Sequence, residues 1–263
     1  MKYRITSFTC LLLTVSLFLF SCNTTSSDKN PPEIPPVEST SVDISEMQTA
    51  SNKTVAKLAE SNFNTALVAA GVAKAILEVN LAIPKVLITA AQDETAEVVN
   101  NSEWEWSFDT AANGQNFGVR LTANAESTDE VIWNFYVTSS GLGLDNQLFF
   151  TGTSDFDATS GTWTYFDLGS GQEVSVVTWQ RSENSASVML EVESDRNNNL
   201  GDTISYEFDG TVKTVVFTDV SEDETTTISY NTETITGFII SPNYNNGAKS
   251  CWDENLNNTT CTE

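Results

Sequence analysis

Apolar and polar residues alternate along most of the chain after residue 100, and this period of two constrains the fold more than any other feature. In the run from Glu103 to Asp109, Trp104, Trp106 and Phe108 share one side of an extended chain. The same alternation recurs in Phe117–Ala123, Val131–Val137, Trp163–Tyr165, Val188–Val192 and Ile204–Phe208. It predicts half-buried β-strands, each with one apolar and one polar face.

Short turn sequences separate these runs, so we expect consecutive strands to pair as hairpins. The turn signals are Asn113-Gly114, Ser140-Gly141, Ser160-Gly161, Ser170-Gly171, Asn197–Gly201 and Asp209-Gly210. Residues 99–263 are therefore predicted to form one antiparallel β domain, a meander of about ten strands.

The segment before these strands, residues 45–98, has apolar residues at helical spacing, many of them alanine. They are Leu58, Phe63, Ala66, Leu67, Ala70, Ala73, Ile76 and Leu77. Pro84 predicts a break, with a second helix over Lys85–Glu97. Because this segment is the large apolar element left to cover the apolar face of the sheet, the predicted fold class is mainly β with N-terminal helices. We expect a strongly curved sheet or open barrel packed on the helical segment.

The first 21 residues have the form of a secretory signal peptide. Lys2 and Arg4 precede the apolar run Leu11–Phe20, which is too short to span a bilayer. Leu19-Phe20-Ser21-Cys22 resembles the lipobox of bacterial lipoproteins. The resemblance implies cleavage before Cys22, lipidation of its sulfur, and a membrane contact through that lipid. The expected location is the cell envelope, at the outer membrane of a Gram-negative bacterium; the alternative is an ordinary signal or uncleaved anchor with Cys22 incidental.

Residues 22–44 carry four of the six prolines of the chain among serine, threonine and acidic residues. This composition favours extended backbone and disfavours a packed element. We therefore expect residues 22–44 to be a tether between the anchor and the folded part.

The chain carries 12 basic and 36 acidic residues, a net charge of −24. Removal of the signal takes away Lys2 and Arg4 and no acid, which makes the net charge −26. A chain this acidic repels phosphate backbones, so nucleic acid is not an expected partner. A solvated acidic surface explains the charge better than an adaptation to high salt or divalent cations.

The cysteines and the missing histidine narrow the chemistry further. Cys10 lies in the signal and Cys22 at the lipobox, which leaves Cys251 and Cys261 as an expected disulfide that closes a C-terminal loop. The chain has no histidine, which excludes Ser-His-Asp hydrolysis and every metal site that needs histidine. We expect neither a cofactor nor an enzymatic activity.

One loop offers oxygen ligands at alternate positions: Asp195, Asn197 and Asn199, followed by Asp202. Calcium loops begin in a similar way. Tyr206, however, stands where a calcium loop of the EF-hand type places a bidentate glutamate. A hairpin loop of turn-forming residues is the favoured interpretation, and a calcium site is the alternative.

Tryptophans and paired carboxylates raise the question of glycans. Trp104, Trp106 and Trp133 belong to apolar faces and are expected in the core, whereas Trp179 and Trp252 are better candidates for an exposed sugar-binding surface. Glu191 and Glu193 are the kind of pair a glycosidase uses, although a solvated strand face explains them more simply.

These observations predict a non-enzymatic, lipid-anchored envelope protein that acts as a binding or structural module. One alternative is a carrier of an apolar ligand, because the predicted architecture resembles the half-barrels of the lipoprotein-carrier and lipoprotein-receptor group of the Lol pathway, which hold acyl chains. A second alternative is a glycan-binding or glycan-cleaving lipoprotein. A glycan, a lipid or another envelope protein would be the partner.

Overall fold

The structure, a computed structural model, describes residues 30–52, 61–112, 114–125, 127, 129–195 and 198–261, without the side chains of residues 79 and 80. The proposed signal peptide, Cys22 and Asn197 therefore lie outside the described residues.

Fourteen strands form one antiparallel sheet whose order follows the sequence from β1 to β14. The strands are β1 (Glu97–Asn100), β2 (Glu103–Ala112), β3 (Gln115–Asn124), β4 (Val131–Ser139), β5 (Leu144–Ser154), β6 (Ser160–Phe166), β7 (Glu173–Arg181), β8 (Ser185–Val192), β9 (Thr203–Asp209), β10 (Val212–Asp219), β11 (Glu224–Asn231), β12 (Gly237–Ile240), β13 (Ser250–Trp252) and β14 (Asn258–Thr259). The sheet is not closed, because β1 and β14 stand at its two ends.

The antiparallel meander is confirmed, but the expected number of about ten strands is too low. Strands β1, β12, β13 and β14 have four residues or fewer, which is too short for an alternating pattern to stand out. The prediction of a turn at Ser160-Gly161 is also wrong, because both residues lie inside β6.

The helices lie on one side of this sheet. They are the 3-10 helix η1 (Val37–Thr40), α1 (Ser45–Asn52) and α2 (Asn62–Gln92); a second 3-10 turn, η2 (Asn245–Gly247), lies between β12 and β13. The Ser61 hydroxyl accepts a hydrogen bond from the Asn64 amide at 3.1 Å, which caps the first turn of α2.

Pro84 does not separate two helices as predicted, because α2 continues through it to Gln92. The parts Asn62–Glu78 and Leu81–Gln92 instead meet at an angle of 65°. Proline has no amide hydrogen for the carbonyl four residues earlier, so the helix bends just before it. The predicted helical run to Glu97 also ends early, since β1 begins at that residue.

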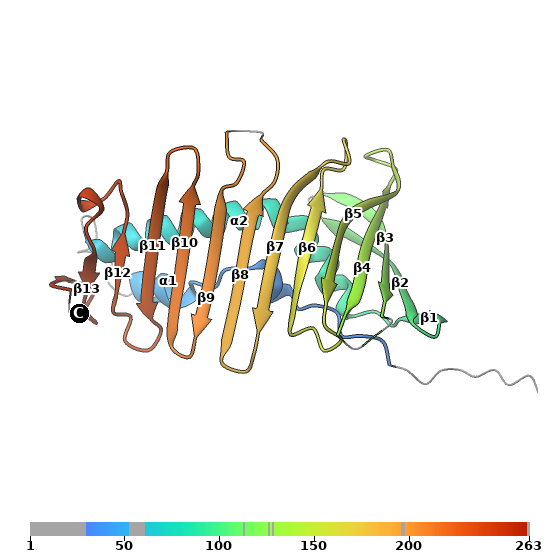
Figure 1. The fold of residues 1–263 in the computed structure, drawn as a ribbon, viewed down its shortest axis with the longest axis horizontal. Coiled ribbons are helices and arrows are strands. Elements are labelled where there is room, and N and C mark those ends of the chain that lie inside the picture. Colours follow the sequence, from blue (N-terminus) through green and yellow to red (C-terminus); the bar gives the residue numbers. More distant parts are fainter. Residues whose placement is uncertain are drawn as a thin grey trace, which may run out of the picture.

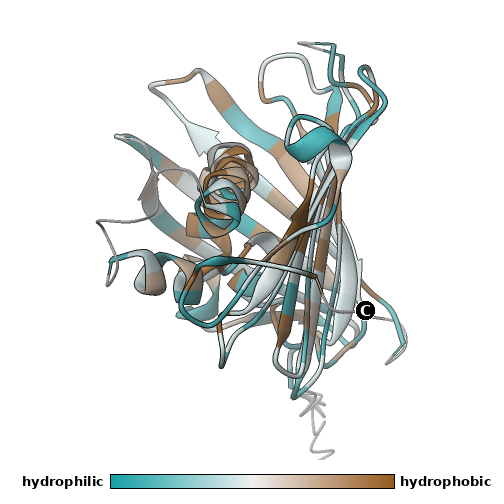
Figure 2. Ribbon diagram, turned by 90° about the vertical axis from the view of Figure 1, so that its left-hand side faces the viewer, coloured by the Kyte–Doolittle hydropathy of each residue, from teal (hydrophilic) through white to brown (hydrophobic). Residues whose placement is uncertain are grey.

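Helix α2 runs along the sheet from end to end (Figure 1). Viewed along the sheet, the strands curve around α2, which lies on their concave side (Figure 2). The helix contacts β2 near one end of the sheet and β10, β12 and β13 near the other. Buried alanines such as Ala66, Ala70 and Ala73 allow the helix backbone to approach the sheet closely.

Residues 30–44, which we call the N-terminal strap, are packed against the sheet. Val42 and Ile44 are at most 1% exposed, the Glu33 amide donates to the Phe156 carbonyl at 3.0 Å, and η1 contacts α2, β7 and β8. The interpretation of residues 22–44 as a free tether is therefore wrong for 30–44. Composition suggested a tether because the few apolar residues of the strap are spread among prolines and polar residues.

All six tryptophans are buried, and three of them lie over a glycine directly opposite on the next strand. The pairs are Gly152 with Trp163, Gly161 with Trp179, and Gly237 with Trp252. A Cβ atom at any of these glycines would collide with the opposite indole ring. Trp179 and Trp252, the predicted exposed sugar platform, are at most 2% exposed, so that interpretation is wrong.

We predict that Ile44→Ala lowers the free energy of unfolding by about 2–4 kcal/mol, because the side chain is fully buried and its removal leaves a cavity. Chemical denaturation followed by tryptophan fluorescence measures the change. Glu38→Ala, at an exposed strap position, is the control and should shift stability by less than about 0.5 kcal/mol. Equal stability of Ile44→Ala and the parent protein would show that the strap does not pack on the sheet.

Candidate functional site

A buried lysine lies at the centre of the polar cluster that joins the N-terminal region to the sheet. The Lys213 ammonium group donates to Asp43 at 2.7 Å and to both carboxylate oxygens of Glu46 at 2.8 Å. Its side chain is only 5% exposed. The Tyr230 hydroxyl donates to Glu46 at 3.1 Å. We call Asp43, Glu46, Lys213 and Tyr230 the Lys213 cluster.

Local structure places each member of the cluster. Lys213 and Tyr230 are opposite each other on β10 and β11, on the face that carries the core. Asp43 precedes α1 and accepts a hydrogen bond from the Ser45 amide at 3.0 Å, and Glu46 follows in the first helical turn. Carboxylates suit the start of a helix because they complement its exposed amides. The cluster thus fixes the start of α1 on the sheet.

Burial and pairing act in opposite directions on the cluster. Burial disfavours the charged form of Lys213, but hydrogen bonds to Asp43 and Glu46 outweigh it and raise the lysine pKa. Burial likewise opposes ionisation of Asp43, and the hydrogen bond from Lys213 is the largest contribution that lowers its pKa overall. Burial raises the pKa of Tyr230, and the Glu46 charge raises it further. The lysine is therefore a charged structural group and not a neutral amine poised for nucleophilic attack.

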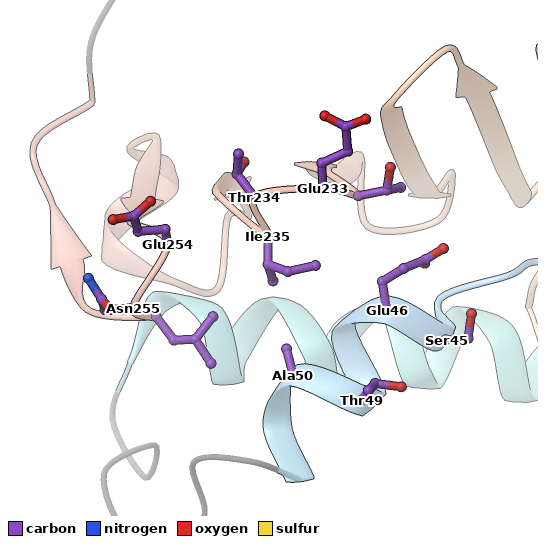
Figure 3. A pocket seen from close by; sticks show the side chains of 11 residues that line it. Ser45, Glu46, Thr49, Ala50, Glu233, Thr234, Ile235, Glu254 and Asn255 are labelled. Carbon is purple, nitrogen blue, oxygen red and sulfur yellow. The ribbon is translucent and has the colours of Figure 1, made fainter.

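A cavity of about 810 Å³ opens beside this cluster, between α1 and two loops of the sheet (Figure 3). Thr232, Glu233, Thr234 and Ile235 come from the β11–β12 turn, and the β13–β14 loop contributes Glu254, Asn255 and Leu256. On the α1 side the cavity is lined by Ser45, Glu46, Thr49 and Ala50.

The cavity combines carboxylates and hydroxyls with an apolar patch. Glu233 and Glu254 lie on the loops, while Ile235 and Ala50 face each other across the space (Figure 3). Such a lining suits a positively charged or hydroxylated group with an apolar part. Glu46 is already bonded to Lys213 and Tyr230, so this carboxylate is a structural group of the cavity wall.

The loop for which calcium is the alternative interpretation connects β8 to β9, and its carboxylates bond to backbone amides. Asp195 accepts from the Asn198 amide at 2.9 Å, and Asp202 accepts from the Val220 amide of the neighbouring loop, also at 2.9 Å. The Asn199 carbonyl accepts from the Asp202 amide at 3.1 Å. Within the part of the chain that the structure describes, no group of three or more acidic or cysteine side chains is placed to hold a metal.

Glu191 and Glu193, weighed above as a glycosidase pair, do not line any of the cavities described for the structure. Glu191 lies on the outer face of β8, opposite Val176 and Thr203, and Glu193 follows the strand, with its amide bonded to the Val174 carbonyl. The Glu191 side chain is half-buried, and the Glu193 side chain is exposed. This placement agrees with a solvated strand face.

The predicted disulfide between Cys251 and Cys261 is present, with the two Cα atoms 5.3 Å apart. It ties the segment after β14 to β13 at the end of the sheet. The residues enclosed by the bridge include Trp252, which packs edge-to-face on Phe63 of α2 at 5.7 Å. The disulfide therefore stabilises the end of the sheet on which α2 begins.

Sequence reasoning did not identify the Lys213 cluster. The available signal was Lys213 itself, since the run Val212–Phe217 places it on the same side as Val215 and Phe217. A lysine on an apolar face requires a buried counter-charge. The partners could not be named from sequence, because Asp43 and Glu46 are about 170 residues away.

Comparison of the chain with protein-family models, with curated proteins and with solved structures finds no match. Among the described helices, none is by itself long and apolar enough to cross a membrane; the two bent halves of α2 reach that length and composition only together.

We predict that Lys213→Met lowers the free energy of unfolding at pH 7 by about 1–3 kcal/mol, because it leaves Asp43, Glu46 and Tyr230 without the charge that holds them. The loss of stability should depend on pH. Asp43 has a lowered pKa, so its contribution is present above its usual value of 3.8 and is lost as the pH falls through the native pKa. Lys213 has a raised pKa, so its contribution is lost only above about pH 10.5.

Denaturation of both proteins from pH 2.5 to 8 tests this prediction, with Lys249→Met at an exposed position as the matched control. The stability difference between Lys213→Met and the parent protein should narrow below pH 3.8. A difference that stays constant through this range would contradict the assigned ion pair.

Proposed function

We propose that this protein is a lipid-anchored, non-enzymatic module of the cell envelope that binds its partner through the outer, polar face of its sheet. The anchor rests on the lipobox Leu19-Phe20-Ser21-Cys22 and the apolar run before it. The outer membrane of a Gram-negative bacterium is the proposed location.

The observation that carries the proposal is that the chain covers its own apolar face. Helix α2, α1 and the N-terminal strap occupy the concave side of the sheet (Figure 2), which leaves the opposite face of the sheet to meet other molecules. A polar surface of this breadth is suited to recognition by contact.

Hydroxyl groups are frequent on this outer face. They meet in cross-strand pairs, which include Thr153 with Thr162 at 3.0 Å, Thr214 with Ser229 at 3.1 Å and Thr218 with Thr225 at 3.2 Å. Threonine suits strands because its branched side chain packs on the pleated surface. The pairs add uncharged polar groups to the outer face.

The packed strap shortens the distance between the proposed anchor and the sheet. Residues 23–29 separate Cys22 from Asn30, the first described residue, and fully extended chain of that length spans at most about 25 Å. A tether over residues 22–44 would have reached about three times as far. A lipid on Cys22 would therefore hold the strap end of the molecule close to the bilayer.

We predict that the full-length protein, expressed in a bacterial host with lipoprotein processing, incorporates labelled palmitate and that Cys22→Ala abolishes the label. The reason is that the acyl chains attach through Cys22 and contribute about 0.8 kcal/mol per buried methylene to membrane binding. Autoradiography of membrane fractions measures incorporation. Cys10→Ala serves as the matched control and should keep the label; an unlabelled parent protein would refute the anchor.

A carrier of an apolar ligand is the second candidate function, favoured by the outward side of α2. Val68 and Val72 are 58% and 55% exposed, although α2 also buries its opposite side on the sheet. A helix that is apolar on both sides is typical of a helix buried on both sides. A carrier would bury the outward side of α2 in one of its two conformations. A carrier would move α2 aside to place an acyl chain on the apolar face of the sheet.

Native mass spectrometry of protein purified from its own envelope distinguishes the two functions. A carrier should retain one or more lipid molecules on a variant without the anchor, Cys22→Ala, and Val72→Asp should reduce that retention. The binding module should be free of lipid under the same conditions. Retained lipid on Cys22→Ala would thus favour the carrier over our first proposal.

A further inference from the structure

Four glycines lie inside strands of the described part of the chain, and three of them have an evident packing reason. Gly152, Gly161 and Gly237 lie beneath tryptophan rings on the inner face. Glycine weakens a strand, and in a strand interior it often marks a bulge, a bend or a place where a ligand approaches the backbone. The pairings of β3 with β2 and β4 have no register shift, so no bulge accounts for glycine there.

Gly118 is that fourth glycine. It lies on the outer face of β3, between Asp109 on β2 and Thr138 on β4. A Cβ atom there would be 3.5 Å from the Asp109 carboxylate and 3.8 Å from the Thr138 Cβ atom, both ordinary contacts. Neither neighbouring side chains nor a positive φ angle requires glycine at this position.

A hollow of about 400 Å³ opens over Gly118, and the side chains around it are held by one another. The Arg120 guanidinium stacks on the Tyr136 ring at 4.1 Å and donates through Nε to the Asn146 side-chain oxygen at 3.1 Å. The backbone amide of Asn146 in turn donates to the Thr138 hydroxyl at 3.0 Å. Arg120 and Tyr136, stacked on each other, both line this hollow, which we call the Gly118 hollow.

Polar groups remain available around the hollow. The Asp109 carboxylate makes no hydrogen bond or ion pair with another described residue, and the Tyr136 hydroxyl and the Asn146 side-chain NH₂ likewise have no partner among these residues. Carboxylate, amide and guanidinium groups can each bond two neighbouring hydroxyls. The planar ring of Tyr136 and the planar guanidinium group of Arg120 are groups that can pack against the C–H face of a sugar ring.

We propose that the Gly118 hollow binds one pyranose ring of a neutral glycan. The two neighbouring carboxylates, Asp109 and Glu105, disfavour an anionic sugar, and Glu105 already pairs with Arg120 at 3.5 Å. This site rests on the proposed function, since it lies on the outer face of the sheet. The proposed site names a ligand class for the outer face. It also differs from the sugar-binding surface considered from the sequence, because Trp179 and Trp252 are buried.

Two variants of the full-length protein test the site. Gly118→Val fills the hollow, and valine suits a strand, so its melting temperature should equal or exceed that of the parent protein. Asp109→Asn keeps the side-chain shape and removes the charged acceptor. Thr164→Val, on the outer face of β6, is the matched control outside the hollow.

The probe is an array of cello-, malto-, manno-, xylo- and chito-oligosaccharides, with calorimetry on the strongest signal. We expect the parent protein and Thr164→Val to bind at least one of these glycans, and both hollow variants to bind it at least tenfold more weakly. If Gly118→Val does not fold, Asp109→Asn decides the result alone.

Three outcomes would overturn the proposal: no binding to the array, binding only to an anionic glycan such as alginate added as a separate probe, or equal binding by the parent and both hollow variants. Each of these leaves the proposed anchor and outer-face function standing. The proposed anchor would fail if the parent protein took up no palmitate. The proposed outer-face function would fail if the Cys22→Ala variant retained lipid.

Discussion

An open sheet of fourteen strands with one apolar face must bury that face, and the rest of the structure follows from this requirement. Thirteen gaps of about 4.8 Å would make a flat sheet about 60 Å wide, whereas a straight helix of 31 residues is about 46 Å long. Helix α2 nevertheless contacts β2 near one end of the sheet and β12 and β13 near the other, and the strands curve around it (Figure 2). The strap and α1 cover what remains.

The tryptophan–glycine pairs contribute to the same solution. Each indole ring lies over a glycine on the next strand and occupies the space that a side chain would take there. The rings are thereby packed close to the sheet, beneath α2 and the strap. The Lys213 cluster has the complementary role, because it fixes α1 at one place on the sheet through charges that cannot be left unpaired. Apolar residues of α2, α1 and the strap cover the sheet, and the ion pairs of Lys213 fix the position of α1 on it.

Because the chain itself covers the apolar face of the sheet, our proposal assigns recognition to the outer face, and the cavity at the end of α1 is a second accessible polar surface. The hollow on the outer face occurs where a strand residue, Gly118, has no side chain. Both places are shaped by backbone and side chains of regular strands and tight turns. A site built on a sheet in this way is held rigidly, which suits binding with little rearrangement.

The sequence by itself determined the elements that depend on local pattern. The alternation of Trp104, Trp106 and Phe108 and its repeats defined an antiparallel meander, helical spacing located the covering segment, and two remaining cysteines predicted the disulfide. These features are local because strand and helix periods are properties of neighbouring residues.

Only the tertiary structure decided the rest. The sequence of the strap predicts a tether, because its apolar residues are too few to show a strand or helix period. They are buried because α2 and the sheet leave a space for them. The same holds for Lys213 and Gly118, whose neighbours come from distant strands and helices. Register and long-range packing, which no local pattern encodes, determine which side chains meet.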